Sequence, residues 1–163
     1  MVLSYPFRTT DQLLLLVKPD QLRDYPVVIA LPVQWGDQDA FGHVNNTVAI
    51  RWFESSRIAY IDASEMGHMM EAGSIGPILA SITCNYRRQL HYPDTVYIGA
   101  RTSKLGRTSM IIEHVVFSEK LDEIAADGTS TIVTFDYKTN RPTRIPDEMR
   151  KECEKLEGWA FEG

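Results

Sequence analysis

Residues 33–47 read Val-Gln-Trp-Gly-Asp-Gln-Asp-Ala-Phe-Gly-His-Val-Asn-Asn-Thr, and they join a predicted strand to a long predicted helix. The connection carries two carboxylates, Asp37 and Asp39, followed by Gly42. A helix begins with unpaired backbone N–H groups and a partial positive charge. A carboxylate beside such donors is suited to acyl hydrolysis, because the amides stabilise charge on the carbonyl oxygen while the carboxylate attacks or activates water.

The segment that follows is predicted to be a helix from about Asn46 to Met66, because its apolar residues recur at helical spacing. Apolar positions cover most of the helix circumference and leave only a narrow polar stripe. They are Val48, Ala49, Ile50, Trp52, Phe53, Ile58, Ala59, Tyr60, Ile61 and Ala63. A helix of this kind is expected to be enclosed by other elements.

The remaining periodic segments are predicted to be strands. Val27–Trp35 is interrupted by Pro32, which favours an edge position or a bulge. Four further strands are expected near Pro77–Arg87, Thr95–Leu105, Ser109–Lys120 and Thr129–Tyr137, with a turn at Ala126-Asp-Gly128 before the last. A short charged helix is expected from Pro146 to about Leu156.

This order of elements predicts an α+β fold in which a curved antiparallel sheet wraps around the long helix. We expect the domain to span residues 27–146, with an N-terminal extension over 1–26 and a C-terminal helix and tail over 147–163. Such a sheet leaves strand edges and helix flanks uncovered, so a homodimer, or a tetramer built as a dimer of dimers, is expected.

Composition argues against several classes of function. The 163 residues carry a net charge of −5, which disfavours general binding to nucleic acid. The apolar run Leu13–Val17 is shorter than a signal-peptide core of about 7–15 residues or a membrane span of about 20. Cys84 and Cys153 fit reduced thiols of a cytoplasmic protein, and the scattered histidines predict neither a metal site nor a cofactor.

A resemblance adds to these inferences. Residues 35–46, Trp-Gly-Asp-Gln-Asp-Ala-Phe-Gly-His-Val-Asn-Asn, followed by Arg-Trp-Phe-Glu-Ser-Ser-Arg at 51–57, resemble the hot-dog-fold thioesterases. The similarity is to the 4-hydroxybenzoyl-CoA thioesterase-like branch, which also contains long-chain acyl-CoA thioesterases, and it covers roughly residues 27–146. It implies a hot-dog fold, an active site at a subunit interface, and hydrolysis of an acyl-CoA or acyl carrier protein thioester without metal or cofactor.

The resemblance also implies roles for individual residues. Asp39 matches the catalytic carboxylate, and the backbone N–H of Asn46 matches the donor that polarises the thioester carbonyl. Glu54 has the spacing of the base in a sister branch, so it is a second candidate base. From the residues themselves we expect Asp37 to tie down the loop, and Gly42 to permit either an unusual backbone geometry or a close approach.

Substrate-binding candidates come from charge and position. His43 is expected to have an orienting or packing role at the substrate site, and action as a base is the alternative. Coenzyme A is anionic, and residues 86–107 carry a local basic excess, from which Arg88, Lys104 and Arg107 are candidate phosphate ligands. Ser109 is a weaker candidate near the pantetheine. The acyl slot is expected beside the long helix, where the candidates are Trp52, Phe53, Met66, Met69 and Met70.

Two other functions fit parts of the sequence. A non-catalytic module that binds acyl thioesters would need the same pocket, and it differs only in releasing no thiol. An acyl-CoA hydratase or dehydratase on the same fold would need a Gly-Asp-x-Asn-Pro-type motif, which this sequence lacks.

Overall fold

The computed structural model describes residues 18–67 and 74–161. Met69, Met70 and Leu13–Val17 therefore lie outside the described residues. The strands are β1 (Val27–Pro32), β2 (Ile75–Tyr86), β3 (Thr95–Leu105), β4 (Ser109–Ser118), β5 (Glu123–Asp136) and β6 (Arg141–Pro142). The helices are α2 (Asn46–Ala63) and α4 (Asp147–Glu157), with short 3-10 turns at Asp20–Leu22 and Trp35–Asp37.

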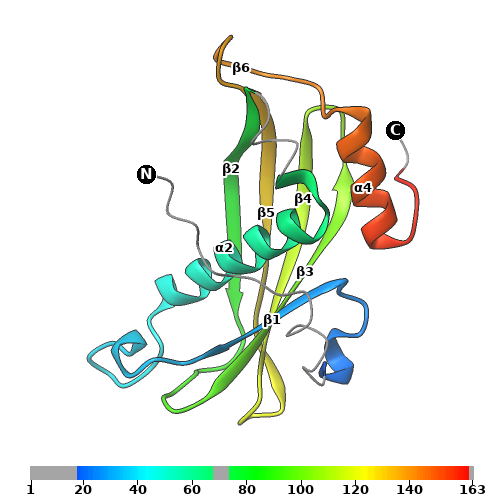
Figure 1. The fold of residues 1–163 in the computed structure, drawn as a ribbon. Coiled ribbons are helices and arrows are strands. Elements are labelled where there is room, and N and C mark those ends of the chain that lie inside the picture. The colour runs from blue at the N-terminus through cyan, green and yellow to red at the C-terminus, as the bar shows by residue number, and fades with distance from the viewer. Residues whose placement is uncertain (1–17, 68–73, 162–163) are drawn as a thin grey trace, which may run out of the picture.

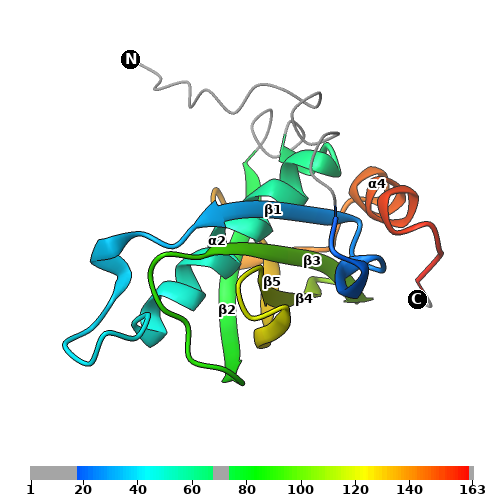
Figure 2. The same cartoon turned by 90° about the horizontal axis from the view of Figure 1, so that it is seen from below.

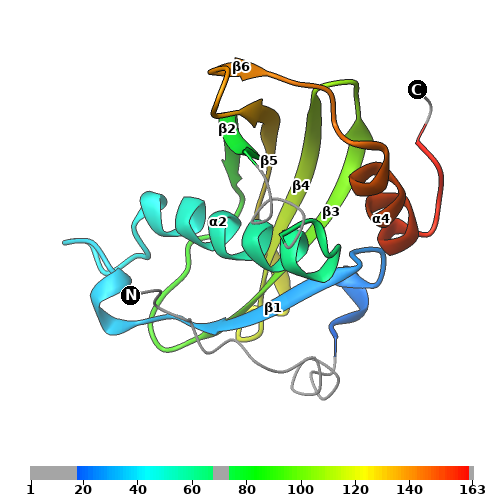
Figure 3. The same ribbon diagram turned by 45° about the horizontal axis from the view of Figure 1, so that its top comes forward.

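The strands form one antiparallel sheet in the order β1-β3-β4-β5-β2, and the short β6 pairs with β5. The sheet curves, and α2 lies across its inner face (Figures 1 and 3). The predicted α+β class, a curved antiparallel sheet around a long helix, is confirmed, and the arrangement is the hot-dog fold. Seen from below in Figure 2, the connection from β1 to α2 projects beyond the sheet.

Helix α2 buries one face against the sheet. Its buried positions recur in pairs about one turn apart, and they are Val48, Ala49, Trp52, Phe53, Ser56, Arg57, Tyr60 and Ile61. On the opposite face, Ile58 is 51% exposed. Within the described protomer the expected enclosure by other elements is therefore complete only on the sheet side, and a flank of the helix is left uncovered.

The predicted turn at Ala126-Asp-Gly128 is also wrong, since these residues lie inside β5. A Cβ atom at Gly128 would lie 2.0 Å from the carbonyl oxygen of Thr83 and 2.8 Å from the ring of Phe53. The glycine is therefore needed for close packing of β5 against its neighbours and does not reverse the chain. The strand β1 is also shorter than predicted, because it ends at Pro32 and Trp35–Asp37 forms a 3-10 turn.

Helix α4 packs against the end of α2 and against β3, and it shares their core. Its buried residues are Met149, Cys153 and Glu157. The Glu157 carboxylate accepts hydrogen bonds from the Tyr60 hydroxyl at 2.7 Å and from the Thr102 backbone N–H at 2.5 Å. Both cysteines are free thiols. Within the described ranges, no helix is long and apolar enough to cross a membrane.

Candidate active site

The loop between β1 and α2 is closed by its own backbone hydrogen bonds. Asp39 N–H donates to the His43 carbonyl at 2.8 Å, and Gly42 N–H donates to the Asp39 carbonyl at 3.0 Å. Gly42 has a φ of 76°, a conformation that side chains disfavour. A Cβ atom there would meet nothing within 4 Å. Of the two reasons expected for this glycine, the structure therefore shows the backbone geometry and not a close approach.

Asp37 fixes this loop to both of its flanking elements. Its buried carboxylate accepts from the Gln34 N–H at 2.8 Å and from the Arg51 guanidinium at 3.0 Å. Its carbonyl accepts from the Asn45 N–H at 2.8 Å. These contacts join the end of β1 to the start of α2, so both oxygens of the Asp37 carboxylate are engaged in holding the loop.

Asp39 is held differently, because only one of its carboxylate oxygens is engaged. Oδ1 accepts from the backbone N–H of Phe41 at 2.8 Å and of His43 at 3.4 Å. Within residues 18–67 and 74–161, no donor contacts Oδ2. The carboxylate is half-buried and oriented by the loop, with one oxygen left for another partner.

The N-terminus of α2 lies beside this carboxylate. Asn45 caps the helix by accepting from the Thr47 N–H at 3.0 Å with its side chain and from the Val48 N–H at 2.9 Å with its carbonyl. The backbone N–H of Asn46 has no acceptor in the described part of the chain. It is a free donor at the positive end of an 18-residue helix.

Tyr86 fixes the position of this helix end from the sheet. Its hydroxyl donates to the Asn46 carbonyl at 2.8 Å. Partial burial, reinforced by contact with Cys84, raises the pKa of Tyr86 to about 12, so the hydroxyl keeps its proton at neutral pH. Sequence reasoning missed this contact, because Tyr86 lies at the end of β2 and meets Asn46 only through the tertiary fold.

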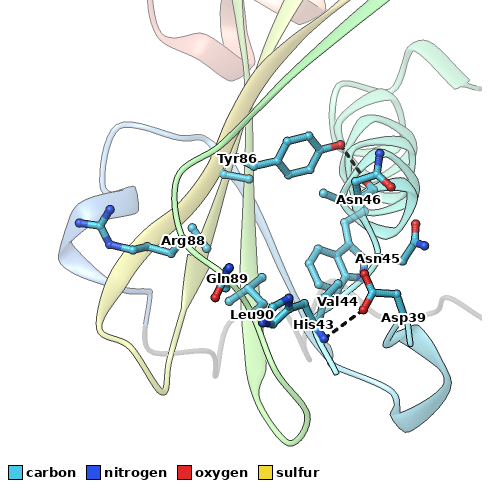
Figure 4. Close-up of a pocket in the computed structure, with 13 residues that line it drawn as sticks. Asp39, His43, Val44, Asn45, Asn46, Tyr86, Arg88, Gln89 and Leu90 are labelled. Atoms are coloured by element: carbon cyan, nitrogen blue, oxygen red, sulfur yellow. Dashed lines mark hydrogen bonds between the residues drawn. The ribbon is translucent and has the colours of Figure 1, made fainter. Parts of the chain in front are cut away.

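A pocket of about 330 Å³ opens between this loop, the start of α2, and the segment that follows β2 (Figure 4). It brings together five residues that the sequence singled out: Asp39, His43, Asn46, Trp52 and Arg88. Its other lining residues are Val44, Asn45, Ala49, Tyr86, Gln89, Leu90, Ala125 and Ala126. In Figure 4 the Asp39 carboxylate and the His43 side chain lie at the same end of the group.

The His43 ring is supported by a second histidine. The rings of His43 and His91 meet edge to face, with centroids 4.9 Å apart, and His91 Nδ1 lies 2.9 Å from the Gly42 carbonyl oxygen. His91 therefore donates to the loop from the segment after β2. Across the described ranges, no three His, Cys, Asp or Glu side chains are grouped so as to hold a metal ion.

The remaining sequence candidates do not line this pocket. Glu54 lies eight residues beyond Asn46, about 12 Å along the helix axis. Its side chain is 65% exposed and is 3.9 Å from Arg57. Lys104 pairs with Ile111 on β4, and Ile111 pairs with Thr131 on β5. Thr131 is five residues, or roughly 17 Å, along β5 from the pocket wall at Ala126.

Arg107 and Ser109 lie at the same end of the sheet as Lys104, where β3 turns into β4. Within one protomer this end is remote from Asp39, and none of these three residues is among those lining the pocket. Their part in substrate binding stays a prediction, as does the part of Glu54 as a second candidate base.

The basic excess predicted for residues 86–107 is largely compensated by acids from elsewhere in the chain. Arg88 forms an ion pair with Glu123, and Arg87 forms one with Asp127. A third pair joins Arg101 to Glu113 at 2.7 Å. Counting charges along the sequence missed these partners, because strand pairing brings them across from β4 and β5.

The family follows from comparison with known proteins. Residues 33–153 match the model of the thioesterase-like superfamily. The chain belongs to the thioesterase-like superfamily. One similar protein is YsmA, an uncharacterized protein of Bacillus subtilis, which is 31% identical over 120 residues, covering 73% of this chain and 79% of YsmA.

Solved thioesterase structures share the fold. A thioesterase from Thermus thermophilus, solved in complex with coenzyme A and zinc, is 31% identical, with a TM-score of 0.75 over 85% of this chain and 99% of that one. YbaW of Escherichia coli, described as a probable thioesterase, is 26% identical, with a TM-score of 0.73 over 80% and 98%. The predicted membership among hot-dog thioesterases is therefore confirmed at the level of the superfamily.

Proposed function

We propose that this chain hydrolyses an acyl thioester of coenzyme A to the free acid and thiol, with Asp39 as the catalytic carboxylate. The observation that carries the proposal is that Asp39 and the N-terminus of α2 line the same pocket. The free N–H of Asn46 is a donor for the thioester carbonyl oxygen, and Asp39 Oδ2 is a free acceptor for a water proton. The two residues that carry the groups required for hydrolysis thus line one cavity.

Two routes are compatible with this arrangement. Asp39 takes a proton from water, and the resulting hydroxide adds to the acyl carbon. Alternatively, Asp39 attacks the carbon itself and forms a mixed anhydride that water then cleaves. In both routes the carbon–sulfur bond breaks and the thiolate leaves with the electron pair. The Asn46 N–H stabilises the oxyanion, and loss of one such donor typically costs about 2.7–4 kcal/mol.

Two features support coenzyme A as the carrier. Arg88 lines the pocket and forms an ion pair with Glu123. Its guanidinium can bind a phosphate of coenzyme A if that phosphate replaces the Glu123 carboxylate. The Thermus relative, 31% identical, was solved with coenzyme A bound. Within the superfamily we place the chain in the 4-hydroxybenzoyl-CoA thioesterase-like branch, on the spacing of Asp37, Asp39, Gly42 and Asn46.

We also propose that the functional form is a homodimer, or a dimer of such dimers, with the pocket at the interface. Strand β2 supports this, because in the described chain it pairs only with β5 and ends the sheet. Leu79 on this strand is a large apolar residue that is 42% exposed. An exposed apolar strand edge of this length is suited to pairing with a second copy.

Thiol release from a panel of acyl-CoAs tests the proposed function. The Asp39→Asn variant keeps the size of the side chain but cannot accept a proton, so we expect turnover to fall by at least about 10²–10⁴-fold. The Glu54→Gln variant is the matched control, because it also removes one carboxylate near α2 but outside the pocket. We expect it to retain wild-type activity.

Four outcomes contradict parts of this assignment. Near-normal turnover by Asp39→Asn excludes Asp39 as the base. A large loss in Glu54→Gln alone transfers the role to the helix carboxylate. If the wild type binds acyl-CoA but releases no thiol, the protein is a non-catalytic binding module. If it cleaves an acyl carrier protein thioester in preference to the CoA thioester, the carrier is acyl carrier protein.

A further inference from the structure

The inner half of the pocket is apolar and continuous with the protein core. Behind the polar mouth formed by Asp39, His43 and the start of α2, the wall consists of Val44, Ala49, Trp52, Leu90, Ala125 and Ala126. None of these side chains carries a charge or a hydrogen-bonding group except the Trp52 indole N–H. The chemistry of this wall suits an uncharged hydrocarbon group.

Three alanines give the pocket its width. Ala49 comes from α2 and is 5% exposed, and Ala125 and Ala126 come from β5 and are 1% and 3% exposed. Two successive strand residues line one pocket because β5 bulges here: Val116 pairs with Ala126, but Phe117 pairs with Ile124. The bulge is held in place, since the Ala125 carbonyl accepts from the N–H groups of Arg87 and Arg88 at 2.8 and 3.1 Å.

Trp52 limits the depth of the pocket. It follows Ala49 by three residues on the same face of α2, and it is 5% exposed. It belongs to the same packed cluster as Phe53 and Ile98, both with no exposed surface. Close-packed interiors leave little space for an extra chain. A longer ligand would therefore have to displace the core.

We propose that this pocket is a slot for a short, uncharged acyl group and that Trp52 sets its length limit. The proposal rests on the proposed thioesterase function. The volume of about 330 Å³ lies near the lower end of the roughly 300–1,000 Å³ found for small-molecule sites. The reacting thioester occupies the polar mouth, so only the inner part is left for the acyl chain. The coenzyme A portion extends outward past Arg88.

The first test is the acyl length preference of the wild-type protein. We expect kcat/KM to be highest for butanoyl- or hexanoyl-CoA and to fall by at least about tenfold for hexadecanoyl-CoA, because extra methylenes cannot be accommodated. A preference for hexadecanoyl-CoA overturns the proposal. Calorimetry on Asp39→Asn gives Kd values for hexanoyl- and hexadecanoyl-CoA, and these values test the slot without turnover. If the wild type releases no thiol, that result contradicts the proposed function but not the slot.

The second test compares two neighbouring residues of α2. Trp52→Leu enlarges the slot, so we expect its activity on decanoyl-CoA to rise at least about tenfold relative to hexanoyl-CoA. Phe53→Leu removes a similar buried ring that does not line the pocket, and its length preference should match the wild type. Ala49→Leu fills the slot and should select against hexanoyl-CoA relative to acetyl-CoA.

These variants also separate specificity from folding. If Trp52→Leu does not fold, the opposite change in Ala49→Leu still decides the matter, because leucine is well tolerated in a helix. Identical length profiles for the wild type and Ala49→Leu overturn the proposal. The same shift in Trp52→Leu and Phe53→Leu also overturns it, because a general loosening of the core would then explain both.

Discussion

Asp37 and Asp39 are two residues apart, yet the fold gives their carboxylates different surroundings. Both oxygens of Asp37 accept hydrogen bonds from the protein, one from the Gln34 N–H and one from Arg51. Asp39 receives two backbone donors on one oxygen and none from the described chain on the other. The sequence predicted a different role for each residue, and the two carboxylates differ in the hydrogen-bond partners that the fold gives them.

Gly42 offers a test of the loop at the level of one residue. Its φ of 76° strains any residue with a Cβ atom, although space around it is open. We expect Gly42→Ala to lower the free energy of unfolding by about 1 kcal/mol, as measured by urea denaturation. Gly36→Ala is the matched control, because Gly36 also has open space but no positive φ, and it should be neutral. Equal effects of the two substitutions would rule out backbone strain at Gly42.

His114 predicts a dependence of stability on acid pH. It is buried between the hydroxyls of Ser56 and Ser130, each 2.9 Å from a ring nitrogen, and stacks on Phe53. Burial, and then the nearby Arg57 charge, lower the pKa of His114 to about 3 from its ordinary 6.5. Between these two values the unfolded chain binds a proton that the folded protein does not, so the free energy of unfolding falls as pH decreases.

The expected contribution of His114 is at most about 1.4 kcal/mol per pH unit. Urea denaturation of the wild type and of His114→Gln at several pH values between about 6.5 and 3 measures it, because the variant cannot take up this proton. The wild type should lose stability more steeply than the variant on acidification. Parallel pH curves for the two proteins would show that His114 does not titrate in this window.

At the scale of single elements, α2 was the most predictable part of the chain. Its start at Asn46 follows from the Asn45 cap, and its buried face follows from the spacing of its apolar residues. Strand β5 was the least predictable. Its first half carries Asp127 and Gly128, a pair typical of turns, and only the partner strand and the ring of Phe53 make an extended conformation favourable there.

Glu157 on helix α4 is expected to make the free energy of unfolding change with pH in the opposite direction from His114. Burial raises the pKa of Glu157 above its ordinary 4.5, against the hydrogen bonds that Tyr60 and Thr102 donate to it. The surrounding groups that also act on it are Arg101, which lowers this pKa, and Glu113, which raises it. Its second oxygen and the Thr102 hydroxyl are buried without partners among the described residues.

The sign of the effect follows from the raised pKa. As pH rises above 4.5, the unfolded chain ionises Glu157 before the folded protein does, so stability is lost until the folded pKa is passed. We expect Glu157→Gln to be more stable than the wild type near neutral pH and to lose this part of the pH dependence. Thermal unfolding at about pH 5 and pH 8 measures it. Equal pH dependence in both proteins would show that Glu157 titrates normally.

At the scale of the whole molecule, two surfaces are left uncovered where a second copy is proposed to bind: the edge of the sheet at β2 and the outer face of α2. Strand β2 ends the sheet, and the outer face of α2 exposes Ile58. The proposed homodimer would pair β2 with its symmetry mate and extend one sheet across both protomers. The sequence predicted such association in general terms, but the strand order identifies β2 as the long free edge.

A pair of leucines tests this interface. Leu79 on β2 is 42% exposed and Leu121 in the β4–β5 turn is 41% exposed, so replacing either with Lys costs similar packing. We expect Leu79→Lys to shift the mass measured by sedimentation equilibrium from dimer toward monomer, because like charges would face each other near the two-fold axis. Leu121→Lys should remain dimeric. A wild-type protein that sediments as a monomer would remove the proposed dimer.

The fold class, the start of the central helix and the family motif around Asp39 could be predicted from the amino-acid sequence, because they depend on local patterns of apolar spacing, capping and turn residues. Which residues meet at the pocket depends on the packing of distant segments. Tyr86, Ala125 and Ala126 reach the start of α2 only through the pairing of β2 with β5, and the arginines of that region find acids on other strands. Contacts between segments distant in sequence leave no periodic signal, so the shape of the pocket follows only from the packing of the curved sheet against one face of α2.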